Sequence, residues 1–114
     1  MNSSILLHSV YFWLAEPGSQ AAVDVIQAGC HEHLAGIPGV LKLSVGVPAG
    51  TDRSVVDNSY GVALIVEFAD AATQESYQIH PDHLRFIEAC SRHWSKVVVY
   101  DTLVEASTQL TILY

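Results

Sequence analysis

The segments of this chain that resemble β-strands carry apolar residues on both faces. Residues 62–68 alternate with the period of two that is typical of a strand, and both the odd and the even positions are mainly apolar. Residues 5–14 and 96–102 show a similar two-sided pattern. A strand with one apolar face needs a single covering layer, whereas a strand with two apolar faces needs cover on both sides. The sequence therefore predicts a sheet that is buried on both faces.

Strand and helix patterns follow one another in the order strand, helix, strand, strand, broken helix, strand. The predicted strands are residues 5–14, 40–47, 62–68 and 96–102, with a polar loop over residues 48–59. This order predicts a single α+β domain of the ferredoxin-like βαββαβ type, with the helices on one face of an antiparallel sheet. We expect the core of this domain to span residues 5–102 and residues 103–114 to form a C-terminal extension.

Both helical regions contain residues that mark where a helix begins or ends. A turn over residues 16–19 leads into the first helix, and residues 36–39, with two glycines and a proline, end it. One face of this helix is an apolar stripe formed by Val23, Ile26, Cys30 and Leu34. Asp70 is placed to cap the second helix, because its carboxylate can accept the free N–H groups of a first turn. Pro81 cannot continue that helix but fits the first turn of a new one, predicted from Asp82 to about Arg92.

Helices on one side of the sheet leave the other side uncovered. By strand periodicity the residues on that side include Leu7, Tyr11, Trp13, Ala63, Ile65, Val98 and Tyr100. The alternate residues of the same strands are predicted to face the helices, and they are Val10, Phe12, Leu64, Val66, Val97 and Val99. Burying one large apolar side chain contributes roughly 1.5–3 kcal/mol, so we expect a face-to-face homodimer through Leu7, Tyr11, Ile65 and Val98. Residues 109–114 are also strand-like and could add to the edge of the partner's sheet.

Charge and composition exclude several classes of partner. The net charge of −7, with only five Lys and Arg in 114 residues, argues against nucleic acid and anionic membranes. The N-terminal apolar stretch lacks the basic region of a signal peptide, and no apolar run reaches the ~20 residues that span a bilayer. A cytoplasmic location is the expectation. Cys30 and Cys90 lie on helical patterns and are expected to be buried thiols.

Two imidazoles and one phenol lie within seven residues, Tyr77 to His83, where the second helical region breaks. A histidine with an ordinary pKa of ~6.5 suits a general base near neutral pH. A tyrosine hydroxyl in a dry pocket suits a donor to a developing oxyanion. The alternative is structural: His80 could be a helix cap and His83 a surface or packing residue. A helix break does not fix the distance between Tyr77 and His83, so both hypotheses stand.

Several parts of the chain together resemble one known family. They are the stretch Tyr77-Gln78-Ile79-His80-Pro81-Asp82-His83, then Phe86, Trp94 and residues 97–101, and also Ile37-Pro38-Gly39-Val40. These residues are similar to the stress-responsive dimeric α/β-barrel family. Plant polyketide cyclases of this family close a poly-β-keto chain by an intramolecular aldol reaction. The resemblance implies Tyr77 as the oxyanion donor and His83 as the base. It also implies pocket roles for His8 and Trp94 and a role in the structure for Asp101. Val62 departs from the cyclase pattern, which has a histidine there.

The candidate substrate-contacting residues are His8, Val10, Phe12, Ile26, Leu64, Val66 and Trp94, although Phe12 and Trp94 also suit the core. No cofactor is expected. A metal site is not expected either, because in Cys30-His31-Glu32-His33 only the first and last residues share a helix face. Three functions remain open: aldol-type or related proton-transfer chemistry on a carbonyl or polyketide-like substrate, a non-catalytic stress-associated dimer or small-ligand binder, and, by fold analogy alone, a monooxygenase.

Overall fold

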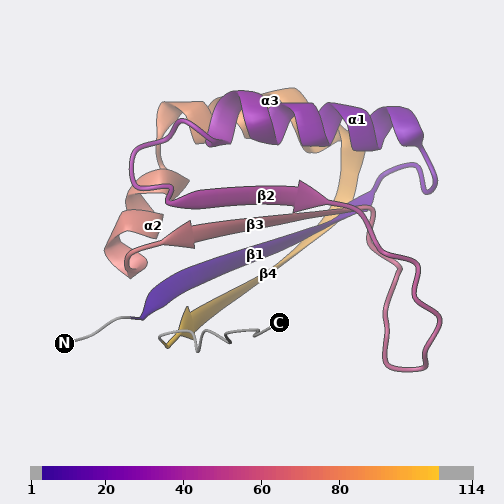
Figure 1. Ribbon diagram of the computed structural model, residues 1–114. Helices are drawn as coiled ribbons and strands as arrows, with labels where there is room; N and C mark the ends of the chain where they lie inside the picture. The colour runs from indigo at the N-terminus through magenta and orange to yellow at the C-terminus, as the bar shows by residue number, and fades with distance from the viewer. Residues whose placement is uncertain (1–3, 106–114) are drawn as a thin grey trace, which may run out of the picture.

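The computed structural model describes residues 4–105, which form one antiparallel four-stranded sheet and three α-helices (Figure 1). The elements are β1 (Ile5–Leu14), α1 (Gln20–Gly29), β2 (Lys42–Gly46), β3 (Val62–Phe68), α2 (Ala71–Gln78), α3 (Pro81–Cys90) and β4 (Trp94–Val104). The strand order is β2-β3-β1-β4, with every neighbouring pair antiparallel. The predicted ferredoxin-like α+β fold is therefore confirmed.

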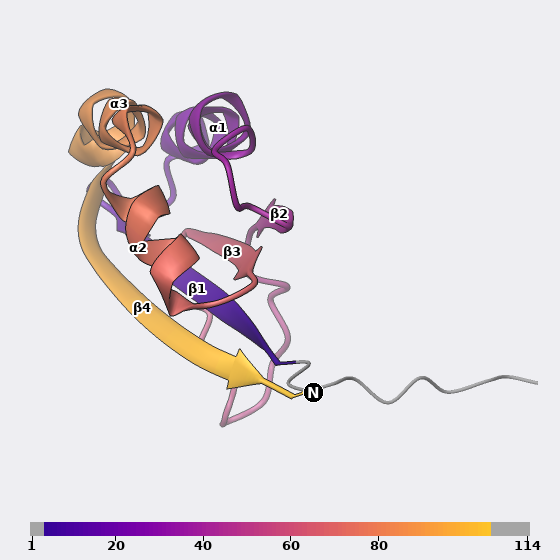
Figure 2. The same ribbon diagram turned by 90° about the vertical axis from the view of Figure 1, so that its left-hand side faces the viewer.

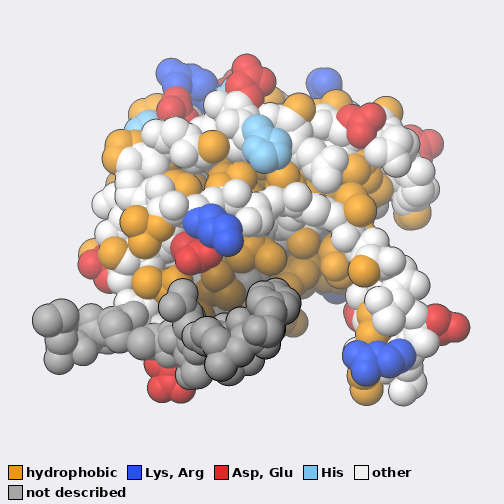
Figure 3. Space-filling view, viewed as in Figure 1, with side chains coloured by type: hydrophobic (Ala, Val, Ile, Leu, Met, Phe, Trp, Pro, Cys, Tyr) orange, Lys and Arg blue, Asp and Glu red, His pale blue; other side chains and the backbone are white. Residues whose placement is uncertain are grey.

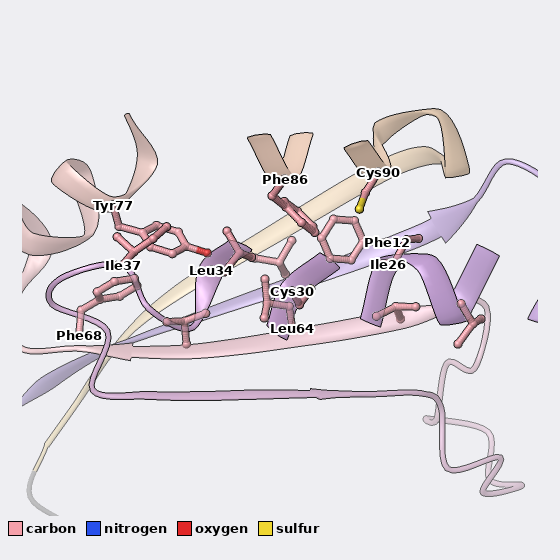
Figure 4. Packing of buried hydrophobic residues seen from close by; sticks show 14 of the residues in the cluster. Phe12, Ile26, Cys30, Leu34, Ile37, Leu64, Phe68, Tyr77, Phe86 and Cys90 are labelled. Carbon is pink, nitrogen blue, oxygen red and sulfur yellow. The ribbon is translucent and has the colours of Figure 1, made fainter. Parts of the chain in front are cut away.

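Helices α1 and α3 lie side by side over one face of the sheet, and α2 lies at one end of that layer (Figures 1 and 2). The apolar stripe predicted for the first helix is buried at all four positions. Helix α1 continues directly into a π-helical segment, Cys30–Leu34, which carries the last two residues of the stripe. The side chains between helices and sheet form one cluster, which includes Phe12, Ile26, Leu34, Leu64, Phe68, Tyr77 and Phe86 (Figure 4).

Each helix begins with a side chain that accepts a backbone hydrogen bond. The Ser19 hydroxyl accepts from the N–H of Ala22, and the Asp70 carboxylate accepts from the N–H of Thr73. His80 caps α3 through its ring, because Nδ1 accepts from the backbone N–H of Asp82 at 3.0 Å. Pro81 occupies the first turn that follows this cap. The cap predicted at Asp70 and the helix restart at Pro81 are confirmed.

The predicted ends of two strands are wrong by a few residues. The second strand was predicted over residues 40–47, but β2 covers only Lys42–Gly46 because the N–H of Val40 is turned back to Ile37. The fourth was predicted over residues 96–102, but β4 runs from Trp94 to Val104 because β1 pairs with it along its whole length. Strand β4 therefore includes the start of the predicted extension. Residues 109–114 lie outside the described part of the chain.

The two faces of the sheet are covered differently. Pairing of Tyr11 with Val98 and of Ser9 with Ile65 places the predicted interface residues on the face away from the helices. In the single chain they are half-buried, and Figure 3 shows hydrophobic side chains gathered over the strands below the helix layer. Val97 and Val99 lie on the helix side of the sheet, as predicted, near Phe86 and Ile87 of α3, yet they are 39% and 45% exposed. They belong to an edge strand that curves away from the helix layer (Figure 2).

Gly29 in α1 lies directly against side chains of α3. A Cβ atom at this position would lie 2.5 Å from Sγ of Cys90. Gly29→Ala should therefore lower the free energy of unfolding by about 1–3 kcal/mol, the usual cost of overpacking a core. Gly36→Ala is the matched control, since nothing lies within 4 Å of the added atom there. Urea denaturation of both variants tests this, and equal stability of the two would contradict it.

Candidate functional site

A cavity of about 100 Å³ lies between the sheet and the paired helices α2 and α3. Its polar lining consists of His8 from β1, Tyr77 and Gln78 from α2, and His83 from α3. The apolar lining residues are Val10, Phe12, Leu64, Phe86, Ile87, Trp94, Val97 and Val99. The polar groups thus share one cavity with a largely apolar wall, which is typical of sites for small molecules.

Seven of the nine predicted site residues line this cavity, namely His8, Val10, Phe12, Leu64, Tyr77, His83 and Trp94. Ile26 and Val66 do not line it. Both are fully buried in the core cluster, where the helix and sheet layers meet. The sequence reasoning missed Gln78, Phe86, Ile87, Val97 and Val99. Two of these could have been found, because Phe86 and Ile87 follow His83 by three and four residues and so share its helix face.

A larger hollow of about 510 Å³ lies beside Trp13, Tyr60 and the turn before α1. Among its lining residues Tyr60 is the one titratable side chain. The smaller cavity brings together two imidazoles and a phenol, which can move protons. We therefore take the smaller cavity as the candidate site.

Strand pairing positions His8 at the cavity. His8 in β1 lies directly opposite Asp101 in β4, and Nδ1 of His8 is 2.6 Å from Oδ1 of Asp101. His8 is buried, whereas the Asp101 side chain is 45% exposed. A carboxylate can only accept a hydrogen bond, so the proton of this contact lies on Nδ1 of His8.

The break between α2 and α3 positions Tyr77 and His83. Tyr77 lies in the last turn of α2, and His83 lies in the first turn of α3, just after the His80 cap. The two rings meet edge to face with centroids 5.0 Å apart, and the Tyr77 ring is 6.0 Å from that of His8. Tyr77 is therefore in ring contact with both cavity histidines. Figure 4 shows its ring extending from α2 toward Leu34, with the hydroxyl foremost.

One polar atom of this group, Nδ1 of His83, is buried and has no hydrogen-bond partner among residues 4–105. Burial, and secondarily the neighbouring His8, lower the pKa of His83, which keeps its imidazole neutral. Burial, and secondarily Cys30, raise the pKa of Tyr77 well above its ordinary value, which keeps the phenol protonated. The site therefore holds a neutral imidazole beside a neutral hydroxyl donor.

The apolar wall is an aromatic group. The rings of Phe12 and Trp94 have centroids 4.7 Å apart, and Phe86 lies 5.6 Å from Trp94. Near this wall Ile87, Val97 and Val99 are between 38% and 45% exposed. The cavity therefore reaches the surface between α3 and β4 through an apolar mouth.

The lowered pKa of His83 predicts how stability depends on pH. Below about pH 6.5 the unfolded chain takes up a proton at His83 that the folded protein resists. The free energy of unfolding should thus fall as the pH drops from about 6.5 toward the folded-state pKa, by at most about 1.4 kcal/mol per pH unit from this group. Urea denaturation between pH 7.5 and 5 measures the slope. His83→Gln should flatten it, whereas His31→Gln, at an exposed helix position, should not. Equal flattening by both variants would contradict the assignment.

No group of three or more His, Cys, Asp or Glu side chains within residues 4–105 is arranged to hold a metal ion. In the motif considered above, Cys30 is fully buried, and burial, then Cys90, raise its pKa to about 12. Such a thiol is a poor metal ligand, because thiolate is the ligating form.

Elemental analysis of tag-free protein purified without added metal should therefore find no stoichiometric zinc or iron. Bound metal that disappears in His33→Ala would contradict this prediction.

The fold and the cavity together define a ferredoxin-like domain with a small, partly polar pocket between its sheet and helices. Residues 6–104 match the model of the stress responsive A/B barrel domain, and the chain belongs to this family. The family resemblance predicted from the Tyr77–His83 stretch is thereby confirmed. None of the helices described is both long and apolar enough to cross a membrane.

Several solved structures share the fold at low sequence identity. A ferredoxin-like protein of the same family from Mesorhizobium loti is 22% identical, with a TM-score of 0.72 over 91% of this chain and 100% of that one. A hydroxynitrile lyase from Passiflora edulis is 20% identical, with a TM-score of 0.72 over 92% and 97%. A dimeric ferredoxin-like protein of unknown function from Thermobifida fusca is 17% identical, with a TM-score of 0.71 over 89% and 92%. The search of curated protein sequences found no match.

Proposed function

We propose that this protein is an enzyme of acid–base chemistry, acting on a small carbonyl compound in the cavity between sheet and helices. The observation that carries this proposal is the buried, unpartnered Nδ1 of His83 beside the neutral hydroxyl of Tyr77. A buried polar atom without a partner costs stability. Such a cost is understandable where a substrate supplies the missing hydrogen bond.

The chemistry these groups suit is proton transfer next to a carbonyl. Removing a proton from the adjacent carbon places negative charge on the carbonyl oxygen, and a fixed donor in a dry site stabilises that charge. Tyr77 is the donor, as the sequence predicts, and an imidazole takes the proton. An aldol-type reaction follows when the resulting enolate adds to a second carbonyl. The P. edulis neighbour is named a lyase for hydroxynitriles, which is consistent with lyase chemistry on this fold.

Cavity size restricts the substrate. The volume of about 100 Å³ lies below the roughly 300–1,000 Å³ of drug-sized sites and below the ~150 Å³ cavity that takes up benzene. A linear poly-keto chain does not fit within it. The substrate part held by the polar groups is therefore a small aldehyde or ketone, and any longer apolar part extends through the mouth beside Ile87, Val97 and Val99.

A second candidate function is ligand binding without catalysis. It is favoured by the close contact of Phe12, Phe86 and Trp94, which fills much of the space near the polar groups with aromatic rings. Under this proposal the same cavity holds a small apolar ligand, and the histidines complete its wall.

For both candidates we propose a cytoplasmic homodimer that takes part in a stress response. The half-buried apolar face of the sheet supports the dimer, and structural neighbours described as dimeric agree with it. The stress role rests on the description of the family alone.

Deuterium exchange separates the two candidates. Butanone is a small ketone with exchangeable protons next to its carbonyl, and NMR in D2O follows their loss. The enzyme proposal expects the wild-type protein to accelerate this exchange above the rate in protein-free buffer at the same pH. His31→Gln, which removes an exposed imidazole outside the cavity, should accelerate it to the same extent as the wild type. A signal from butanone bound at the cavity without any acceleration would favour the binding candidate.

A further inference from the structure

The two cavity histidines differ in which ring nitrogen has a partner in the described part of the protein and which is left free. In His8, Nδ1 donates to Asp101, so Nε2 is the free nitrogen. Within residues 4–105, Nε2 of His8 has no hydrogen-bond partner, and the ring lines the cavity. A neutral imidazole has one donor and one acceptor nitrogen. Nε2 of His8 is therefore a lone pair available to the cavity.

In His83 the nitrogen with a partner is Nε2, and within residues 4–105 Nδ1 is the one left free. The Gln74 amide nitrogen donates to Oε1 of Gln78 at 2.8 Å, with the Gln78 amide nitrogen on the other side of the group. That orientation leaves the Gln78 amide nitrogen facing Nε2 of His83 at 3.4 Å. An amide nitrogen only donates, so Nε2 of His83 is the acceptor. The proton of neutral His83 then lies on the unpartnered Nδ1.

We infer that the base of the proposed reaction is Nε2 of His8, with Asp101 as its positioning residue, and that His83 acts with Tyr77 as a hydrogen-bond donor. This inference rests on the proposed function and moves the base from His83 to His8. Three titratable groups surround His8: Asp101 from β4, Tyr77 from α2 and His83 from α3. The carboxylate among them compensates the positive charge that His8 gains with the proton. His83 has no carboxylate in contact with it within the described chain.

The proposed proton transfer needs no co-reactant. The C–H bond next to the substrate carbonyl breaks, its proton goes to Nε2 of His8, and its electron pair forms the enolate. The enolate oxygen accepts hydrogen bonds from the Tyr77 hydroxyl and from Nδ1–H of His83. When the enolate carbon is reprotonated, or adds to a carbonyl to give an alkoxide, His8 returns the proton and the site is restored.

The tautomers can be observed without substrate, using ¹⁵N NMR of protein labelled in its histidine rings. At a pH where both rings are neutral, the wild type should show the proton on Nδ1 of both His8 and His83. Asp101→Ala should shift the His8 proton toward Nε2, because the acceptor for Nδ1–H is lost. Asp82→Ala is the matched control, since Asp82 lies 3.9 Å from the ring of His80 and not at the cavity. A proton on Nε2 of His8 in the wild type would overturn the inference.

Butanone exchange then tests the roles. His8→Gln should reduce the exchange rate by about 10²–10⁴-fold, the usual contribution of a general base. Asp101→Ala should lower kcat with KM unchanged, because Asp101 orients the base without touching substrate, and Asp82→Ala should leave both unchanged. If the wild type exchanges butanone and His8→Gln does so equally fast, the inference falls while the proposed function stands. If the wild type does not accelerate exchange at all, the proposed function falls and this inference falls with it.

Discussion

Ile65→Lys is expected to convert the proposed dimer into monomers or to unfold it. Ile65 lies in the middle of β3 on the face away from the helices, opposite Ser9 of β1 and Ser44 of β2. In a symmetric dimer each substitution occurs twice across the interface. An unpaired ammonium group buried there costs several kcal/mol, which corresponds to a dissociation constant raised by at least about 100-fold.

Sedimentation velocity at micromolar concentration measures this change. Leu84→Lys is the control, because Leu84 on α3 is 58% exposed and already faces solvent, so its charge should not affect association. Circular dichroism distinguishes a folded monomer from an unfolded chain. A wild-type protein that sediments as a well-folded monomer would end the dimer proposal, whatever the variants do.

Local sequence patterns were sufficient to predict the bounds of β1 and β3. In β3 the buried positions 62, 64, 66 and 68 alternate with half-buried ones, as the period of two requires. The helix cap at Asp70 was equally predictable, because a short polar side chain just before a helix can accept the free N–H groups of its first turn. Hence the order of elements, and with it the fold class, followed from the sequence.

The ends of β2 and β4 depend on their partners and not on local pattern. Strand β4 extends to Trp94 and Val104 because β1 offers hydrogen bonds along that whole length. The exposure of Val97 and Val99 depends on how far the helix layer reaches over an edge strand. Periodicity assigns a residue to a face, but it does not say whether that face is covered at that point.

In the candidate site, too, the sequence predicts some of the residues but not the contacts between them. The residue types at Tyr77 and His83 pointed to proton transfer, and the family resemblance added His8. The pairing of His8 with Asp101 depends on the register between β1 and β4, which are far apart in sequence. The role of Gln78 depends on its amide nitrogen facing Nε2 of His83 at 3.4 Å. Neither contact has a signal in the sequence, and together they decide which nitrogen of each histidine carries a proton.

Tyr77→Phe should abolish most of the proposed activity while leaving the protein as stable as the wild type. The ring is 1% exposed and packs edge to face on Phe68 at 4.9 Å and on His83 at 5.0 Å, and phenylalanine keeps both contacts. Tyr77 also lines the candidate cavity, so the substitution changes the polarity of the cavity wall and leaves the packing of the ring in place.

The expected loss in butanone exchange is about 10²–10³-fold, the usual effect of removing one donor to a developing oxyanion in a dry site. Tyr60→Phe is the matched control, because that ring lines the larger hollow beside Trp13 and not the candidate site. Denaturation midpoints of both variants should equal that of the wild type. If Tyr77→Phe exchanges butanone at the wild-type rate, the hydroxyl is not the oxyanion donor. If instead it melts well below Tyr60→Phe at an unchanged rate, Tyr77 is a packing residue and the binding candidate becomes the better account of the cavity.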